Sequence, residues 1–115
     1  MCRIVALLTL VGFLLTAGAA DARRRADRAE RAAIAKVMQV PARCATVYVS
    51  TVNRRWASFR FNFRGEACLP YASDGVAVLR KRHGRWRQVT AGSAFECPVR
   101  NVPPRIVKDL RIECF

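Results

Sequence analysis

The residues of this chain whose type and spacing most clearly carry chemistry are its cysteines. Five are present, and one of them, Cys2, precedes an uncharged apolar run near the N-terminus. The sequence has no Cys-x-x-Cys pair and its only histidine is His83, so the pattern does not match a zinc site. An even number of spaced cysteines in a small exported domain is typical of disulfides. We therefore predict two disulfides, no metal site and no cofactor, with the bonded residues being Cys44, Cys68, Cys97 and Cys114.

No other residues form a recognisable catalytic group. His83 stands beside Gly84 in a dipeptide that favours a turn, and nothing in the sequence identifies a nucleophile or acid as its partner. Asp74 and Glu66 also stand next to glycines, where carboxylates bond to nearby backbone in turns. The sequence thus predicts a protein that is not an enzyme and has no catalytic residues.

Basic residues are abundant, and many of them cluster at two expected hairpin tips. The chain has 21 lysines and arginines against 8 acidic residues, a formal net charge of +13. Two explanations remain open: the arginine- and alanine-rich composition that a GC-rich genome produces, or affinity for nucleic acid, acidic wall polymer or anionic lipid. Under the second explanation, the expected binding residues are Arg54, Arg55, Arg80, Lys81, Arg82, Arg85 and Arg87.

Residues 1–20 have the features of a signal peptide. Arg3 precedes the uncharged run, and small residues of the kind that signal peptidase cleaves lie at its end. Three arginines follow the run, and by the positive-inside rule they leave open an uncleaved membrane anchor with the domain inside the cell. The spaced cysteines favour export to an oxidising compartment. We predict a single domain over 21–115, secreted or in the cell envelope, that meets the membrane only through its leader.

Apolar periodicity predicts one long helix followed by strands. Residues 22–40 repeat alanine and valine at three- and four-residue intervals up to Pro41, and the arginine-rich first turn is expected to fray. Residues 75–82 and 85–90 read as two strands around a two-residue turn. The tail over 98–115 is expected to hold one short helix. The predicted fold class is α+β: an N-terminal amphipathic helix packed on an antiparallel sheet of about four strands, a short C-terminal helix and two disulfides.

The expected first hairpin, residues 45–63, has one clearly apolar face. Because side chains alternate along a strand, Val47 and Val49 must face the phenylalanines of the second strand. This alternation predicts Val49 opposite Phe59 and Val47 opposite Phe61, with a three-residue loop. The other face of this hairpin is expected to be solvated. In the second hairpin neither face is cleanly apolar, and its inner side stays open.

The first hairpin also suggests how the cysteines pair, although four cysteines allow three connectivities. Cys44 is expected at the open end of this hairpin, and Cys68 lies a few residues beyond that end. Cys97 and Cys114 would then tie the exit of the last strand to the tail. We predict the bonds Cys44–Cys68 and Cys97–Cys114, which are both local.

The order of these features resembles small exported proteins of high-GC bacteria. The features are a leader, a helix, the four spaced cysteines, Arg55-Trp56-Ala57, Gly75-Val76-Ala77-Val78-Leu79-Arg80 and Gly84-Arg85-Trp86-Arg87. The resemblance implies a helix and a curved sheet similar to the cystatin-like or nuclear-transport-factor-like roll. It implies no catalytic residue, since many unrelated functions occur on such a fold.

Binding is therefore the expected function. The first expectation is a non-enzymatic binding or accessory protein of the cell envelope or extracellular space, with an unknown protein partner. The alternative is a cationic protein that binds an anionic polymer through its arginine-rich tips. A small-ligand or enzymatic cavity stays open as a third class but lacks an identifiable reactive group. Trp56 and Trp86 stand beside arginines and are expected in the core.

Overall fold

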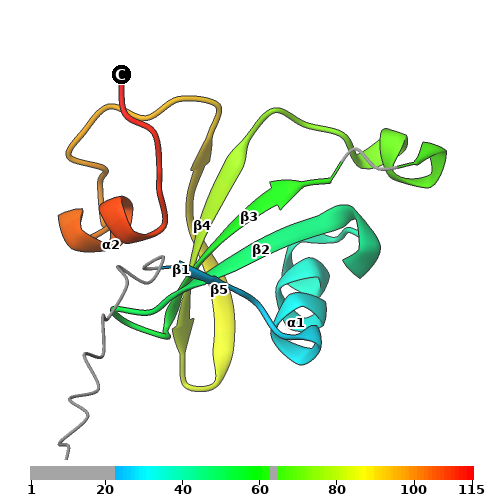
Figure 1. Cartoon of the computed structure of the whole chain (residues 1–115), viewed down its shortest axis with the longest axis horizontal. Helices are drawn as coiled ribbons and strands as arrows, with labels where there is room; N and C mark the ends of the chain where they lie inside the picture. The colour runs from blue at the N-terminus through cyan, green and yellow to red at the C-terminus, as the bar shows by residue number, and fades with distance from the viewer. Residues whose placement is uncertain (1–22, 63–64) are drawn as a thin grey trace, which may run out of the picture.

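The structure, a computed structural model, describes residues 23–62 and 65–115. The predicted signal peptide over 1–20 lies outside this part of the chain. Five strands form one antiparallel sheet in the order β1-β2-β3-β4-β5 (Figure 1). The elements are β1 (Arg23–Arg25), α1 (Arg28–Met38), η1 (Ala42–Cys44), β2 (Ala45–Ser50), β3 (Trp56–Phe61), η2 (Glu66–Tyr71), β4 (Val76–Arg82), β5 (Arg85–Gly92) and α2 (Pro104–Asp109). Across the described ranges, no helix is both long and apolar enough to span a membrane.

The expected start of the first helix is wrong, because Arg23–Arg25 form a strand. This strand, β1, pairs with β2 and raises the sheet from the expected four strands to five. The helix α1 begins only at Arg28, after Asp27, whose side chain accepts a hydrogen bond from the backbone N–H of Glu30. Arginines are unfavourable beside the positive end of a helix, whereas an edge strand tolerates them.

The helix α1 packs on one face of the sheet. It ends at Met38, and Gln39 caps it in the left-handed conformation (φ 58°). Ile34 and Ala35 are its buried residues, and they join an apolar cluster that includes Val47 and Phe59. Because α1 contacts both β2 and β5, which are not neighbours in the sheet, the sheet curls around the helix (Figure 1).

The register of the first hairpin differs from the predicted one by two residues. Val47 lies opposite Phe59 and Val49 lies opposite Ala57. The predicted apolar face is confirmed, because a shift of two residues returns each side chain to the same face. The strands end at Ser50 and restart at Trp56, so the loop is longer than the three residues expected.

The second hairpin has the predicted two-residue turn. His83 and Gly84 connect β4 to β5 with φ angles of 50° and 74°. Positive φ at both central residues is the requirement of the type I′ turn, which glycine meets without strain. The pairing shifts between Val78 and Leu79, where β5 carries one extra residue.

A second apolar cluster covers the sheet face that was expected to be solvated. That expectation is wrong at Ser50 and Ser58, which are fully buried or nearly so. The helix α2 and its flanking loops lie on this face, on the other side of the sheet from α1 (Figure 1). Both faces of β4 are therefore buried over Val76–Leu79, which explains why these four residues show no alternation with polar side chains, whereas Arg80–Arg82 extend beyond the core. The cluster contains Trp56, Val76, Val78, Phe95, Val99, Val102, Ile106, Val107, Leu110 and Ile112.

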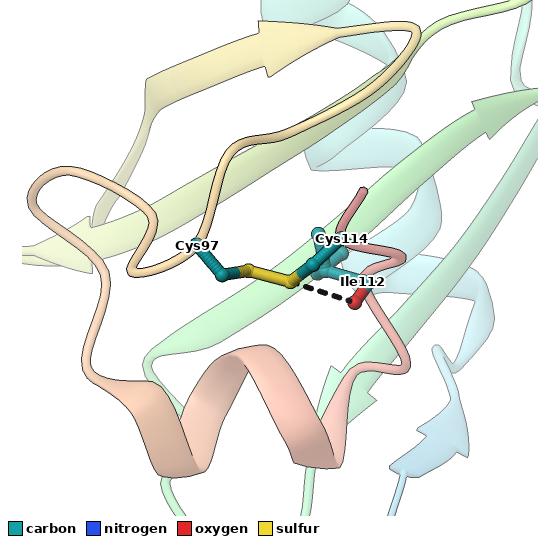
Figure 2. The surroundings of a disulfide bond; sticks show 3 residues. All are labelled: Cys97, Ile112 and Cys114. Carbon is teal, nitrogen blue, oxygen red and sulfur yellow. Dashed lines mark hydrogen bonds between the residues drawn. A yellow bond between two sulfur atoms is a disulfide. The ribbon is translucent and has the colours of Figure 1, made fainter.

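Both predicted disulfide pairings are confirmed. Cys44–Cys68 joins η1 to η2 and is buried at both ends. Cys97–Cys114 closes the C-terminal segment that contains α2, and both of its cysteines are exposed (Figure 2). The Cys114 sulfur lies 3.9 Å from the carbonyl oxygen of Ile112. This is a packing contact, because a disulfide sulfur has no proton to donate.

Candidate functional site

The two arginine-rich tips lie at the same end of the sheet. The backbone N–H of Lys81 donates a 2.7 Å hydrogen bond to the carbonyl of Arg55, and Trp56 pairs with Arg80 across β3 and β4. These contacts bring the β2–β3 loop beside the tip of the second hairpin. They border a hollow of about 890 Å³, here called the basic hollow, lined by Arg24, Asp27, Glu30, Arg54, Arg55, Arg80, Lys81, Arg82, His83, Gly84 and Trp86.

Sequence reasoning missed three residues of the basic hollow. Arg24 comes from β1, which was expected to be a frayed helix end, and Asp27 and Glu30 come from the start of α1. The signal for the helix start was present, because Asp27 and Glu30 have the three-residue spacing of a capping box. The position of Arg24 depends on the pairing of β1 with β2, for which the three arginines give no local signal.

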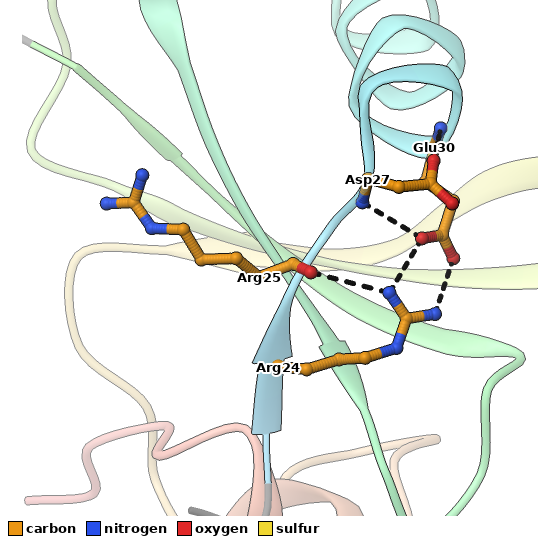
Figure 3. A network of polar contacts seen from close by, with 4 residues as sticks. All are labelled: Arg24, Arg25, Asp27 and Glu30. Atoms are coloured by element: carbon orange, nitrogen blue, oxygen red, sulfur yellow. Dashed lines mark hydrogen bonds and ion pairs between the residues drawn. The ribbon is translucent and has the colours of Figure 1, made fainter.

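Both acidic side chains of the basic hollow are already engaged. The guanidinium of Arg24 donates to the two carboxylate oxygens of Glu30 at 2.8 and 2.9 Å (Figure 3). Glu30 also accepts from the backbone N–H of Asp27, and the Asp27 carboxylate accepts from that of Glu30. The hydrogen bond from Arg24 holds the pKa of Glu30 at about 2, although partial burial opposes this shift, and the same bond raises the pKa of Arg24. The other cations of the hollow are thus left without these carboxylates as partners.

At this end of the sheet, some of the predicted basic residues lie on the α1 face and others on the α2 face. Lys81 lies opposite Trp86 on the α1 face, whereas Arg80 lies beside Trp56 on the α2 face. Arg85 and Arg87 do not line the basic hollow. With Arg82 and His83 they line a neighbouring hollow of about 500 Å³.

Trp56 and Trp86 are core residues, as expected. Their side chains are 2% and 7% exposed, so neither ring is free to stack on a ligand. Each instead supports a cation: the Arg80 guanidinium lies 5.3 Å from the Trp56 ring, and the Lys81 ammonium lies 5.8 Å from the Trp86 ring. Around these two rings the site therefore offers positive charge and not a stacking platform.

Hydrogen bonds to the side chains of Ser50 and Asp109 hold the β2–β3 loop in place. Ser50 accepts from the backbone N–H groups of Val52 and Asn53, and its hydroxyl donates to the carboxylate of Asp109 in α2. The same Asp109 oxygen accepts from the N–H of Thr51 at 3.1 Å. The loop that carries Arg54 and Arg55 is thus tied to the C-terminal helix.

The three side chains that sequence analysis considered as possible catalytic groups are all exposed. His83 is exposed at the turn, Glu66 is exposed at the start of η2, and Asp74 is exposed before β4. Within 23–62 and 65–115, no three His, Cys, Asp or Glu side chains lie close enough together to hold a metal ion.

Comparisons with known proteins identify no relative of this chain. No protein-family model, no curated protein and no solved structure matches the chain. The resemblance to exported roll-fold proteins therefore stays a prediction, and the function must be argued from the site itself.

Proposed function

We propose that this protein is a secreted or cell-envelope domain, without enzymatic activity, that binds an anionic polymer at the basic end of its sheet. One observation carries the proposal: cations from β1, the β2–β3 loop and the second hairpin converge on one hollow. Six cationic side chains line it, and its two acidic side chains are held by Arg24 and by the α1 N-terminus. Convergent charge of one sign raises the local concentration of counter-ions and attracts polyanions.

The exposure of the charged groups favours a polymer over a small buried ligand. Arg54, Arg55 and Arg82 are all exposed, so they can contact several anionic groups of one chain at once. Each contact releases a condensed counter-ion from the polymer, and this release drives binding at low salt. Such binding needs no base stacking, in agreement with the burial of both tryptophans.

The disulfides and the leader support the proposed location. Two disulfides persist in oxidising compartments and are reduced in most cytosols. The apolar run over residues 4–20 provides a route for export. The curling of the sheet around α1 supports our interpretation of the fold as a roll of the cystatin-like or nuclear-transport-factor-like kind.

The proposal is tested by the double variant R54Q/R55Q against the matched variant K36Q/R43Q. Both variants remove two exposed cations, but Lys36 lies in the last turn of α1 and Arg43 in η1, away from the basic hollow. Binding of labelled oligothymidylate and of polyglutamate is measured by fluorescence anisotropy from low to high NaCl. We expect R54Q/R55Q to weaken binding about tenfold at low salt and to reduce the salt slope by about 1 to 2. K36Q/R43Q is expected to change affinity less than about threefold.

Two outcomes would reject the proposal. The first is that neither polymer binds the wild-type protein. The second is that the two variants lose affinity for the polymers by the same factor. Equal loss would mean that overall charge, and therefore arginine-rich composition, explains the binding.

The expectation of an unknown protein partner stays a prediction. Such a partner requires a contiguous apolar patch larger than a monomer usually exposes. Among the described residues, the exposed large apolar side chains are Val37 in α1, Val52 in the β2–β3 loop, Leu69 and Tyr71 in η2, and Phe115 at the end of the chain.

A further inference from the structure

Four arginines at the tip of the second hairpin form two cross-strand pairs of like charge. Arg80 lies opposite Arg87, and Arg82 lies opposite Arg85. Residues directly opposite in an antiparallel pair have Cβ atoms about 4.5–5.5 Å apart, and like charges there are destabilising. These four residues are here called the arginine face.

The two-residue turn sets this arrangement. With His83 and Gly84 as the turn, Arg82 must pair with Arg85, Lys81 with Trp86 and Arg80 with Arg87. The same register places Trp86 in the α1-side cluster. A β-bulge follows between Val78 and Leu79, where Val89 is the extra residue of β5, so the register of the tip differs from that of the rest of the hairpin. If the outer register continued to the tip, Gln88 would lie opposite Arg80 and Arg87 opposite Lys81.

The two hollows that adjoin the arginine face outside the basic hollow have no acidic lining, and the Glu30 carboxylate of the basic hollow is bonded to Arg24. A hollow of about 370 Å³ lies beside the face, with Arg80, Arg82 and Arg87 around Trp56 and Asn101, and no acidic side chain lines it. The neighbouring hollow of about 500 Å³ has only arginines and His83. The Nε of Arg80 is buried and has no hydrogen-bond partner. The face therefore carries charge that an external anion can compensate.

The spacing of the face fits a linear polymer with one charge per repeat. Along each strand the arginines recur every second residue, about 6.7 Å apart, and the two strands lie about 4.8 Å from one another. Successive phosphates of a phosphodiester chain are separated by one sugar or polyol unit, a distance of the same order. The planar guanidinium donates two parallel hydrogen bonds to phosphate oxygens, which a lysine ammonium does not.

We propose that the arginine face binds the phosphodiester backbone of a linear polymer. Its like-charge pairs lower the stability of the folded protein, and they are retained because they bind that backbone. This inference rests on the proposed function and names the chemical class of the polymer. Arg80 and Arg82 border both the arginine face and the basic hollow, whereas Arg85 and Arg87 belong to the arginine face and do not line the basic hollow. The proposal predicts that replacing arginines of the face by glutamine raises the stability of the folded protein and lowers its affinity for the phosphodiester polymer.

The test uses the double variant R82Q/R85Q, because both side chains are exposed and they form one cross-strand pair. Three probes are used: oligothymidylate, a glycerol phosphate polymer and polyglutamate of similar charge. We expect the wild type to bind both phosphodiester polymers about tenfold more tightly than polyglutamate, and the variant to lose this preference. Without ligand, the melting temperature of R82Q/R85Q is expected to rise by about 1–4 °C as the repulsion is removed. The matched variant K36Q/R43Q should leave both the preference and the melting temperature unchanged.

A second variant, R82K/R85K, keeps the charge and removes the guanidinium fork. It is expected to bind phosphodiesters more weakly while its binding of polyglutamate is unchanged. Equal binding of all three polymers by the wild type overturns the inference, as does binding of oligothymidylate alone, which would indicate contacts to the nucleoside. A lower melting temperature in R82Q/R85Q also overturns it, because the arginines would then be structural.

The failure of this inference is distinguishable from failure of the proposed function. If the wild type binds the polymers, and R54Q/R55Q weakens this binding but R82Q/R85Q does not, only the proposed role of the arginine face is rejected. If none of the three polymers binds, the proposed function fails as well.

Discussion

At the scale of single residues, Arg24 and Glu30 connect the first strand to the first helix. The guanidinium donates to both carboxylate oxygens, and Glu30 completes the capping box with Asp27 (Figure 3). The carboxylate therefore satisfies the exposed N-terminus of α1 while it neutralises one cation of the basic hollow. Glu30 thus contributes both to the cap of α1, together with Asp27, and to the orientation of the Arg24 side chain, whose backbone is placed by the pairing of β1 with β2.

The pH dependence of stability follows from this pair. The pKa of Glu30 is about 2 in the folded protein against 4.5 for an unperturbed glutamate, so its stabilisation is present above about pH 4.5 and is lost as the pH falls toward 2. The variant E30Q should lose about 1 kcal/mol at pH 7, since both groups are part-exposed, and its unfolding should vary less between pH 4.5 and 2. Urea denaturation across this range measures both effects. The exposed Glu96, changed to Gln, serves as control, and a pH profile of E30Q that follows the wild type contradicts the assignment.

At the scale of elements, α2 and the β2–β3 loop behave as one unit. Ser50 ends β2 and is fully buried, and its hydroxyl bonds both to its own loop and to Asp109. These bonds account for the longer β2–β3 loop, because two backbone N–H groups of the loop donate to the Ser50 hydroxyl instead of to the backbone of a tight turn. The register of β2 against β3 is therefore set partly by a helix nearly sixty residues later in the chain.

The variant S50A tests this unit. Removing the hydroxyl leaves two N–H groups without their acceptor and one buried Asp109 oxygen with a single donor, so we expect a loss of about 2–3 kcal/mol of unfolding free energy. Urea denaturation followed by tryptophan fluorescence measures it. Thr46→Ala, on the same strand and half-buried, is the comparison. A loss for S50A no larger than that of the comparison would show that the network does not stabilise the loop.

At the scale of the molecule, the sheet separates two apolar clusters, and the two disulfides secure different segments. Cys44–Cys68 is buried and joins the helical turns on either side of the first hairpin. Cys97–Cys114 is exposed and closes the segment that covers the α2 face. The α1-side cluster contains no residue of that segment, so it does not depend on this bond directly.

Reduction should therefore open the two disulfides in sequence. Because a thiolate must reach the sulfur that it attacks, we expect dithiothreitol to reduce Cys97–Cys114 well before Cys44–Cys68. Timed alkylation and mass spectrometry of the native protein report the order. The variant C97S/C114S should lose about 2–4 kcal/mol of stability and still fold. Simultaneous opening of both bonds would contradict this order and indicate that reduction requires global unfolding.

The sequence by itself determined the features that depend on near neighbours. Alternation placed Val47, Val49 and Phe59 on one face, because a strand repeats every two residues whatever its partner. The His83-Gly84 turn and both disulfide pairings were predictable because their determinants lie close together along the chain.

Only the tertiary structure decided the features that join distant segments. The strand β1, the two-residue difference in register and the second apolar cluster all depend on partners far along the chain, whose positions no local pattern records. The same holds for the candidate site. The sequence shows arginines at two tips, but the hydrogen bond from Lys81 to Arg55 brings those tips together, and the pairing of β1 adds Arg24. Charge is a property of each side chain, whereas a convergent field requires the fold to place the charges side by side.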